Sequence, residues 1–350
     1  MPPREKEVVV SGAAGLGAAV AAESGSELGE VDVEARGYWE LVWIRFKRDK
    51  VAIASGVFIV LLILTAFAGA PIAQHFIGHG PDDIFVGTQA ITPGLLPAGP
   101  WTWIDNYLNG KHELLVLGAS DQLGRDEFLR LLYGAQVSLE VAGLSTVGVM
   151  AIGVTLGAIA GYFRGWIDTI ISRVTEVTMA FPALLFIIAL AATVGPRLDT
   201  VTLGVFGKGV ITLVLIFTIF GWFYPARIMR AQVLSIREKE YIEAARMIGA
   251  SDLRIIRSHV LPHLIAPMIV YSTLIVASYI LAEAGLSFLG LGIKPPTASW
   301  GNLLAVAPAY YTTQPWLMLW PGLAVLLTTL AFNLLGDGLR DAFDPRAAHR

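Results

Sequence analysis

Long apolar stretches alternate with shorter polar segments along most of this chain. Six of the stretches approach or exceed the roughly 20 apolar residues that a helix needs to cross a bilayer. They cover residues 51–76, 137–162, 174–194, 210–224, 264–289 and 316–335. Lipid offers no hydrogen-bond partner to open backbone groups, so we expect each stretch to be helical. The pattern predicts an all-α integral membrane protein with about six transmembrane helices.

The composition supports a membrane protein. Of the 350 residues, 55% are hydrophobic and only 15% are charged, whereas soluble domains carry roughly 25% charged residues. Too few polar residues remain to cover a soluble surface. The chain has no cysteine, which excludes disulfides, thiol catalysis and cysteine-based metal sites.

The distribution of lysine and arginine predicts the orientation of the chain. If the N-terminus lies inside, most basic residues fall in the inner segments around 36–50, 164–173, 227–257 and 340–350. The outer segments then hold six basic residues: Lys111, Arg125, Arg130, Arg197, Lys208 and Lys294. Inner loops of membrane proteins are enriched in positive charge. We therefore expect both termini to lie in the cytoplasm.

The remaining segments divide the chain further. Residues 1–35, rich in Gly, Ala, Ser and Glu, are predicted to be a disordered cytoplasmic tail. Residues 36–50 place aromatic side chains at helical spacing among basic ones, which is typical of an interfacial amphipathic helix or of a plain anchor beside the first span. An extracytoplasmic loop is expected over 77–134, a five-helix core over 135–340 and a second cytoplasmic tail over 341–350.

The sequence offers no energy source of its own. The Gly-Lys pair ending at Lys208 is followed by no Ser or Thr, so no phosphate-binding loop is present. His259 and His263 are separated by Pro262, and no third metal ligand is apparent. We predict no cofactor or metal on this chain, which is therefore passive, coupled to an ion, or driven by a partner.

A polar segment, YIEAARMIGASDLRIIRSHVLP at 241–262, stands between the fourth and fifth apolar stretches. The pattern predicts two short helices. Gly249 would end the first of them, and Ser251 or Asp252 would cap the second. Helical spacing predicts one apolar face on each helix: Tyr241, Ala244, Ala245 and Ile248 on the first, and Leu253, Ile256 and Val260 on the second. The hairpin is either a solvated linker resting on the membrane or a docking element for a cytoplasmic protein.

The hairpin resembles the EAA signature of ABC-importer permeases. The matching residues are Glu243, Ala244, Ala245, Gly249, Leu261 and Pro262. His259 replaces the usual Ile, as is frequent in the peptide-importer branch. Residues 43–63, 121–139 and 283–304 are similar to the C-type permease subunit of dipeptide and oligopeptide importers. The loop over 78–115 is enlarged relative to that family.

The resemblance implies a type I ABC-importer permease fold in a bacterial or archaeal cell membrane. It implies four partners: a homologous B-type permease, two cytoplasmic ATPases that carry ATP and Mg, and an extracytoplasmic peptide-binding protein. It implies ATPase coupling by Glu243, Ala244, Ala245, Arg246, Gly249, Ser251, Asp252, Leu261 and Pro262. A less specific prediction assigns an outer gate or binding-protein contact to Gln122, Arg125, Asp126, Glu283, Pro295 and Trp300.

Three alternatives remain open at this point. The same fold could import another cargo, such as nickel chelates or opines. A stand-alone ion-coupled carrier would require carboxylates near the bilayer midplane, whereas Glu140, Glu176 and Glu283 lie near the ends of the predicted spans. A membrane scaffold without transport activity is the third alternative.

Overall fold

The computed structural model describes residues 37–107, 110–201 and 209–344. The chain forms two units, 1–43 and 44–350, and each is considered by itself. The predicted tail at 1–35 and Lys208 lie outside the described residues, as do residues 345–350 of the predicted tail at 341–350, whose first three residues belong to the last helix. The elements are α2 (Tyr38–Phe46), α3 (Lys50–Leu64), a π-turn (Thr65–Gly69), α4 (Ala70–Ile77), β1 (Thr102–Asn106), β2 (Lys111–Leu115), α5 (Glu127–Phe163), α6 (Gly165–Ala180), α7 (Ala183–Thr193), α8 (Gly195–Val201), α9 (Val210–Gly221), α10 (Phe223–Arg237), α11 (Glu240–Met247), α12 (Asp252–Ile255), a second π-turn (Ile256–Val260), α13 (Leu261–Phe288), α14 (Trp300–Val306), a 3₁₀ turn (Ala307–Ala309) and α15 (Trp316–Phe343).

The apolar stretches are helical, as predicted. Among the described residues, four helical segments are long and apolar enough to cross a membrane, or six if each of two bent pairs counts as one span. The predicted helix at 36–50 appears as α2. The second span begins ten residues earlier than expected, because Asp126 caps α5 by accepting hydrogen bonds from the N–H groups of Phe128 and Leu129.

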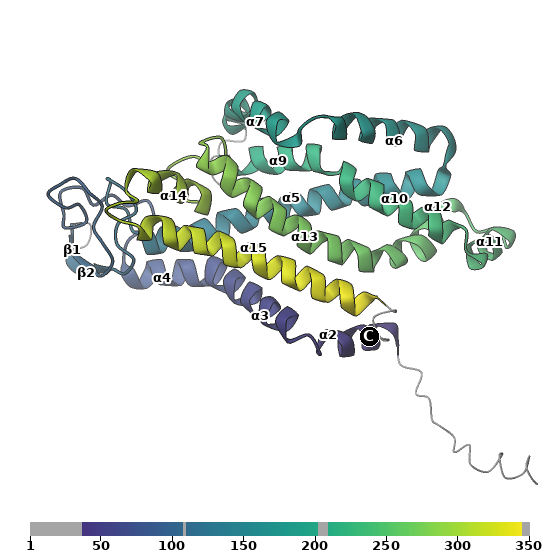
Figure 1. Ribbon diagram of the computed structural model, residues 1–350, viewed down its shortest axis with the longest axis horizontal. Coiled ribbons are helices and arrows are strands. Elements are labelled where there is room, and N and C mark those ends of the chain that lie inside the picture. The colour runs from purple at the N-terminus through teal and green to yellow at the C-terminus, as the bar shows by residue number, and fades with distance from the viewer. Residues whose placement is uncertain (1–36, 108–109, 202–208, 345–350) are drawn as a thin grey trace, which may run out of the picture. The chain divides into compact units, whose positions relative to one another are not determined.

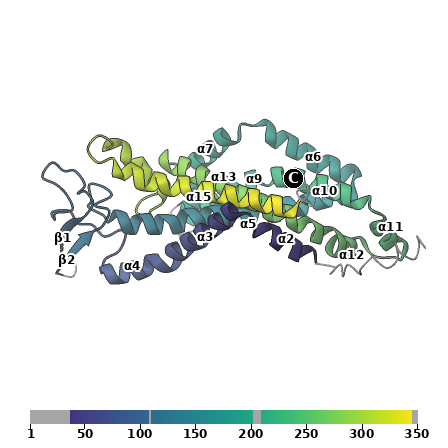
Figure 2. The same ribbon diagram turned by 60° about the horizontal axis from the view of Figure 1, so that its bottom comes forward.

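The third predicted span, at 174–194, is not one continuous helix. It breaks between α6 and α7, whose axes differ by 83°. Pro182 has no backbone N–H and disfavours helical geometry at the residue before it. Phe181 accordingly adopts an extended conformation, with φ −81° and ψ 141°. Figure 2 shows α6 and α7 as an arch beside α9 and α10.

The longest helix, α5, is central to the unit that begins at Ile44. One end, which we call the strand end, adjoins the segment that contains β1 and β2 (Figure 1). The other end, which we call the hairpin end, adjoins α11 and α12. α13 packs against both α5 and α15, and α15 in turn packs against α3. The two strands pair antiparallel, with Ile104 opposite Glu113.

Glycines on one side of α5 form a seam against α9 and α10. We define the glycine seam as Gly148, Gly153, Gly157 and Gly161. A Cβ added at Gly157 would lie 2.5 Å from the carbonyl oxygen of Ala226 and 2.9 Å from the Cβ of Met229. The backbones of α5 and α10 therefore approach to a distance that only glycine permits. Small residues commonly allow such close helix packing in membranes.

Substitution of the seam should destabilise the protein. Gly157→Ala places a methyl group against backbone, and overpacking of this kind costs about 1–3 kcal/mol. Gly143 lies on the same helix, and an added Cβ there meets nothing within 4 Å. Gly143→Ala should instead raise stability slightly, because alanine favours helix over glycine. Thermal unfolding of the detergent-solubilised variants should shift in opposite directions, and equal shifts would contradict a close-packed seam.

Candidate functional site

The polar segment between α10 and α13 forms a compact helical hairpin, which we call the hairpin (residues 240–262). Gly249 ends α11 in the left-handed region, with φ +82°, as predicted. The Ala250 N–H donates to the Ala245 carbonyl at 3.0 Å, and the Gly249 N–H donates to the Arg246 carbonyl at 2.9 Å. These two bonds make a Schellman cap. Ser251 precedes α12 in extended geometry, but its side chain makes no capping hydrogen bond.

Tyr162, near the end of α5, attaches the hairpin to the longest helix. Its hydroxyl donates to Asp252 Oδ1 at 2.7 Å, and its carbonyl accepts from Arg237 Nη1 at 2.5 Å. The guanidinium of Arg246 lies 5.2 Å from the centre of its ring, within the range of cation–π attraction. Glu243 and Arg246, three residues apart on α11, form no ion pair in the described part of the chain. No pattern in the sequence pointed to Tyr162.

The predicted apolar faces of the hairpin are partly wrong. Ile242, Ala245, Ile255 and Val260 are the buried residues that join the core cluster formed with α5, α10 and α13. Of the predicted apolar faces, Tyr241, Ala244 and Ile248 of the first and Leu253 of the second are exposed. Short helices with few turns give an ambiguous apolar period, and the turn at Gly249 reorients α12. Ala245, one of the signature residues, therefore packs inward.

Most predicted coupling residues lie on the accessible side of the hairpin. Glu243, Ala244, Arg246, Gly249, Ser251, Asp252 and Pro262 are exposed, and Leu261 is half-buried. Three apolar side chains stand among them: Met247 is 82% exposed, Ile248 86% and Leu253 75%. We call these three residues the apolar tip. Exposed apolar groups rimmed by polar residues mark interaction surfaces.

A second cluster lies at the strand end. There His79 connects α5 to the segment between α4 and α5 (residues 78–126), which we call the outer segment after its predicted position. Its Nδ1 lies 2.7 Å from Glu113 Oε2, and its Nε2 lies 3.1 Å from Asp126 Oδ2. Asn106 also donates to Glu113 at 2.6 Å, and the ring packs edge-on against Phe85. Burial lowers the pKa of His79, but hydrogen bonds and charge attraction from Asp126 and Glu113 outweigh burial, so its pKa is raised above 6.5.

The predicted outer residues divide by exposure. Gln122 and Pro295 are exposed. Four residues are buried and hold the strand end together: Arg125, Asp126, Glu283 and Trp300. Glu283 accepts hydrogen bonds from Ser138 of α5 and from Ser287, both at 2.7 Å. Trp300 Nε1 donates to the Leu131 carbonyl at 3.1 Å. A direct partner contact fits the two exposed residues. Glu283 and Trp300 join α5 to α13 and α14, whereas Arg125 pairs with Asp121 and Asp126 contacts His79.

The raised pKa of His79 makes the outer segment sensitive to pH. The stabilisation is complete below about pH 6.5, the usual histidine value, and is lost as pH rises through the raised pKa. We therefore expect the free energy of local opening at β2 to fall as the pH is raised from about 6 to about 9. Amide hydrogen exchange measures this free energy once the observed rates are corrected for the intrinsic exchange rates. His79→Gln should remove this dependence. His75→Gln, at an exposed site on α4, should retain it, and an unchanged profile for His79→Gln would contradict the prediction.

Two family models match the chain. Residues 153–349 match the binding-protein-dependent transport system inner membrane component. Residues 37–97 match the N-terminal transmembrane domain of oligopeptide transport permease C. The first match covers α9, α10, the hairpin and α13, and the second covers α2 to α4.

Curated relatives align over most of the chain. The glutathione transport system permease protein GsiD of Pectobacterium atrosepticum is 38% identical over 90% of this chain and 93% of its own length. The dipeptide transport system permease protein DppC of Alkalihalophilus pseudofirmus is 35% identical over 88% and 90%. A putative peptide transport system permease protein of Brucella suis is 46% identical over 66% and 73%.

A solved structure shares the fold. It is an inward-facing conformation of the MetNI methionine ABC transporter, with a TM-score of 0.50 and 16% sequence identity. The likeness covers 62% of this chain and 97% of that one. The type I permease fold expected from the sequence is thereby supported by the arrangement of the helices.

Proposed function

Because the chain belongs to the family of binding-protein-dependent transport system inner membrane components, we propose that it forms half of a peptide translocation pathway that a cytoplasmic ATPase drives through the hairpin. The names of its relatives, which refer to glutathione, dipeptide and peptide transport systems, support a short peptide as cargo. They do not favour the nickel-chelate, opine or ion-coupled alternatives.

The apolar tip is the observation that carries the coupling proposal. Met247, Ile248 and Leu253 are exposed on a hairpin whose backbone is fixed by the Schellman cap and by Tyr162. Apolar anchors surrounded by polar residues supply most of the energy of protein interfaces. A partner bound to the apolar tip would, when it moves, displace the hairpin together with Tyr162. Because Tyr162 belongs to α5, a movement of the ATPase would reach the membrane helices.

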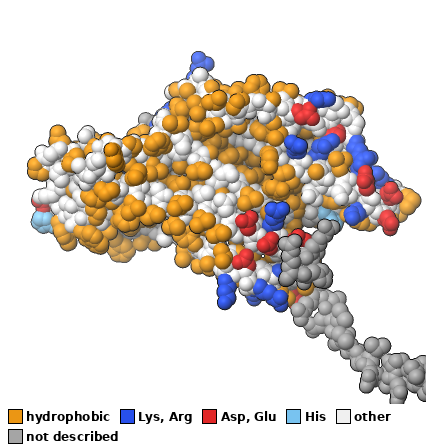
Figure 3. Space-filling view, in the orientation of Figure 1, with side chains coloured by type: hydrophobic (Ala, Val, Ile, Leu, Met, Phe, Trp, Pro, Cys, Tyr) orange, Lys and Arg blue, Asp and Glu red, His pale blue; other side chains and the backbone are white. Residues whose placement is uncertain are grey.

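The charge distribution supports placing the hairpin in the cytoplasm. Figure 3 shows charged side chains gathered toward the hairpin end, where α10 to α12 lie, and mostly apolar side chains over the rest of that face. Basic residues at this end match the positive-inside rule. Both termini would then be cytoplasmic, and β1 and β2 would face the extracytoplasmic binding protein. ATP and Mg would act on the two ATPase partners, beside a homologous B-type permease, and this chain would carry out no hydrolysis.

Purification of the intact complex tests the partners. The full-length chain, isolated from its native membrane in mild detergent, should bring with it two ATPase chains and a second permease. Ile248→Asp should reduce ATPase recovery at least tenfold, because a charged group cannot occupy an apolar contact. Ile84→Asp, at an exposed site in the segment between α4 and β1, is the matched control and should retain the ATPases. Recovery of the ATPases with Ile248→Asp would contradict the proposed tip contact.

Gly249 provides a separate test of coupling. An added Cβ meets nothing within 4 Å, so Gly249→Arg should insert and fold with only a strain cost of about 1–2 kcal/mol from the left-handed backbone. It should nevertheless abolish peptide uptake, because the side chain covers the contact surface. Gly290, with φ +76° and equally open space, lies at the strand end, and Gly290→Arg should keep ATPase association. Normal uptake by Gly249→Arg would refute docking at this surface.

A further inference from the structure

The break between α6 and α7 lies in a segment whose composition is otherwise that of a membrane span. Only together are the two helices long and apolar enough to cross a membrane. Non-helical backbone at membrane depth is tolerated where it is covered by protein or lines a water-filled path. Of the residues of α6 and α7, Thr175 and Ala191 are the buried ones. This chain therefore leaves most of the broken span uncovered.

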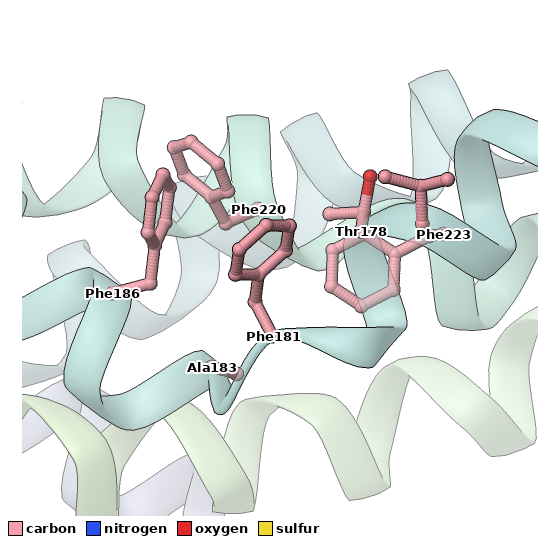
Figure 4. A pocket seen from close by; sticks show the side chains of 7 residues that line it. Thr178, Phe181, Ala183, Phe186, Phe220 and Phe223 are labelled. Carbon is pink, nitrogen blue, oxygen red and sulfur yellow. The ribbon is translucent and has the colours of Figure 1, made fainter.

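A hollow lined by aromatic rings lies at the break, which we call the phenyl hollow (Figure 4). Its volume is about 560 Å³, including its open mouth. The phenyl rings come from Phe181 at the break, Phe186 of α7, Phe220 of α9 and Phe223 of α10. The ring centres of Phe186 and Phe220 are 4.6 Å apart.

The glycine seam fixes the depth of the phenyl hollow. A Cβ at Gly153 would lie 2.9 Å from the Trp222 carbonyl, and Trp222 stands between Phe220 and Phe223. Gly153 is ten residues before the end of α5, which is about 15 Å at 1.5 Å per residue. The hydrocarbon core of a bilayer is roughly 30 Å thick. With Arg164, directly after α5, taken as the inner edge of the bilayer, the phenyl hollow lies near half depth.

A polar hollow lies beside it, between α6 and α10, with a volume of about 650 Å³. Its lining includes Glu176, Arg227 and Arg230. Arg230 donates to Asp168 at 2.6 Å, and Glu176 pairs with Arg173 at 2.8 Å. Arg227 is exposed and has no ion pair among the described residues. One positive charge in this hollow is thus available to an anion.

The two hollows are aligned along one face of α10. Phe223 and Arg227 are four residues apart, so they share a face and are separated by about 6 Å along the axis. Two residues of extended peptide span about 7 Å. A dipeptide could place an apolar side chain in the phenyl hollow and direct its terminal carboxylate toward Arg227.

We propose that the phenyl hollow and Arg227 form a subsite for short peptides with an apolar side chain and a free carboxylate. This inference rests on the proposed peptide-import function and adds the chemistry that the pathway recognises. A lipid chain or an apolar helix of the partner permease would match the phenyl rings but would leave Arg227 without a counter-charge. A peptide matches both halves of the site.

Side-chain selectivity of uptake tests the phenyl hollow. The complete transporter, reconstituted in vesicles, is assayed with Gly-Leu and Gly-Gly. Phe220→Ala should raise the KM for Gly-Leu about tenfold or more, as expected for lost apolar contact, and should change the KM for Gly-Gly less than twofold. Phe67→Ala, at an exposed apolar site in the first π-turn, is the matched control and should change neither. Equal changes for both peptides would overturn the subsite.

A second variant keeps the test decisive if Phe220→Ala fails to fold. Ala183 lines the hollow and is exposed, so Ala183→Trp should fill the space and exclude Gly-Leu while passing Gly-Gly. Arg227→Gln should weaken uptake of both peptides about equally, because both carry a terminal carboxylate. Unchanged selectivity in Ala183→Trp would overturn the proposal.

The outcomes separate the subsite from the function on which it rests. If the wild-type transporter fails to take up any peptide, the proposed function is wrong. If it takes up both peptides and no hollow variant alters their ratio, only the subsite is wrong. A disulfide formed between a cysteine at Phe186 and one on the partner permease in the peptide-loaded state would also overturn it, since the partner would then occupy the hollow.

Discussion

The close contact between the glycine seam of α5 and the backbone of α10 is the constraint on which the arrangement depends. At Gly157 the space for a side chain is already taken by the Ala226 carbonyl. Apolar burial gives little drive for helix association in lipid, so close backbone packing supplies the attraction. The seam fixes how deep α10 lies, and α10 carries one wall of both hollows before it leads into the hairpin.

The hairpin and the proposed subsite are therefore mechanically connected. Tyr162, one residue before the end of α5, bonds to Asp252 of α12 and to Arg237 of α10. Phe223 and Arg227 lie on the same α10, toward its other end. A displacement of the apolar tip can reach the subsite through Tyr162 and Arg237 and then along α10. Rigid elements with packed neighbours are suited to carry such coupling.

Several buried polar groups at the strand end are hydrogen-bonded to one another. Asp126 both caps α5 and contacts His79. Glu283 of α13 accepts from Ser138 of α5 and from Ser287 of its own helix. Polar networks of this kind tolerate little displacement, because a buried group that loses its partner carries a substantial penalty. The outer segment is accordingly fixed to the same long helix that bears the seam and, at its other end, holds the hairpin.

The sequence by itself determined the class of protein, the number of apolar segments, the left-handed turn at Gly249 and the family signature around Glu243. These follow from composition, span length and local backbone chemistry, which need no distant partner. The family comparisons confirm the permease assignment, and the assignment of individual coupling residues stays a prediction. Pro182 could have marked the break in the third span, since proline disfavours helix at the residue before it, but the size of the bend depends on packing.

Only the tertiary structure decided which side of the hairpin faces outward, and it buried Ala245 while exposing Ile248 and Leu253. It also buried Trp300 and Glu283, brought His79 between two carboxylates, and gathered four phenylalanines around one hollow. These groupings join residues distant in the chain. Their positions depend on how closely α5 and its neighbours pack. The local periodicity of the sequence does not determine that distance.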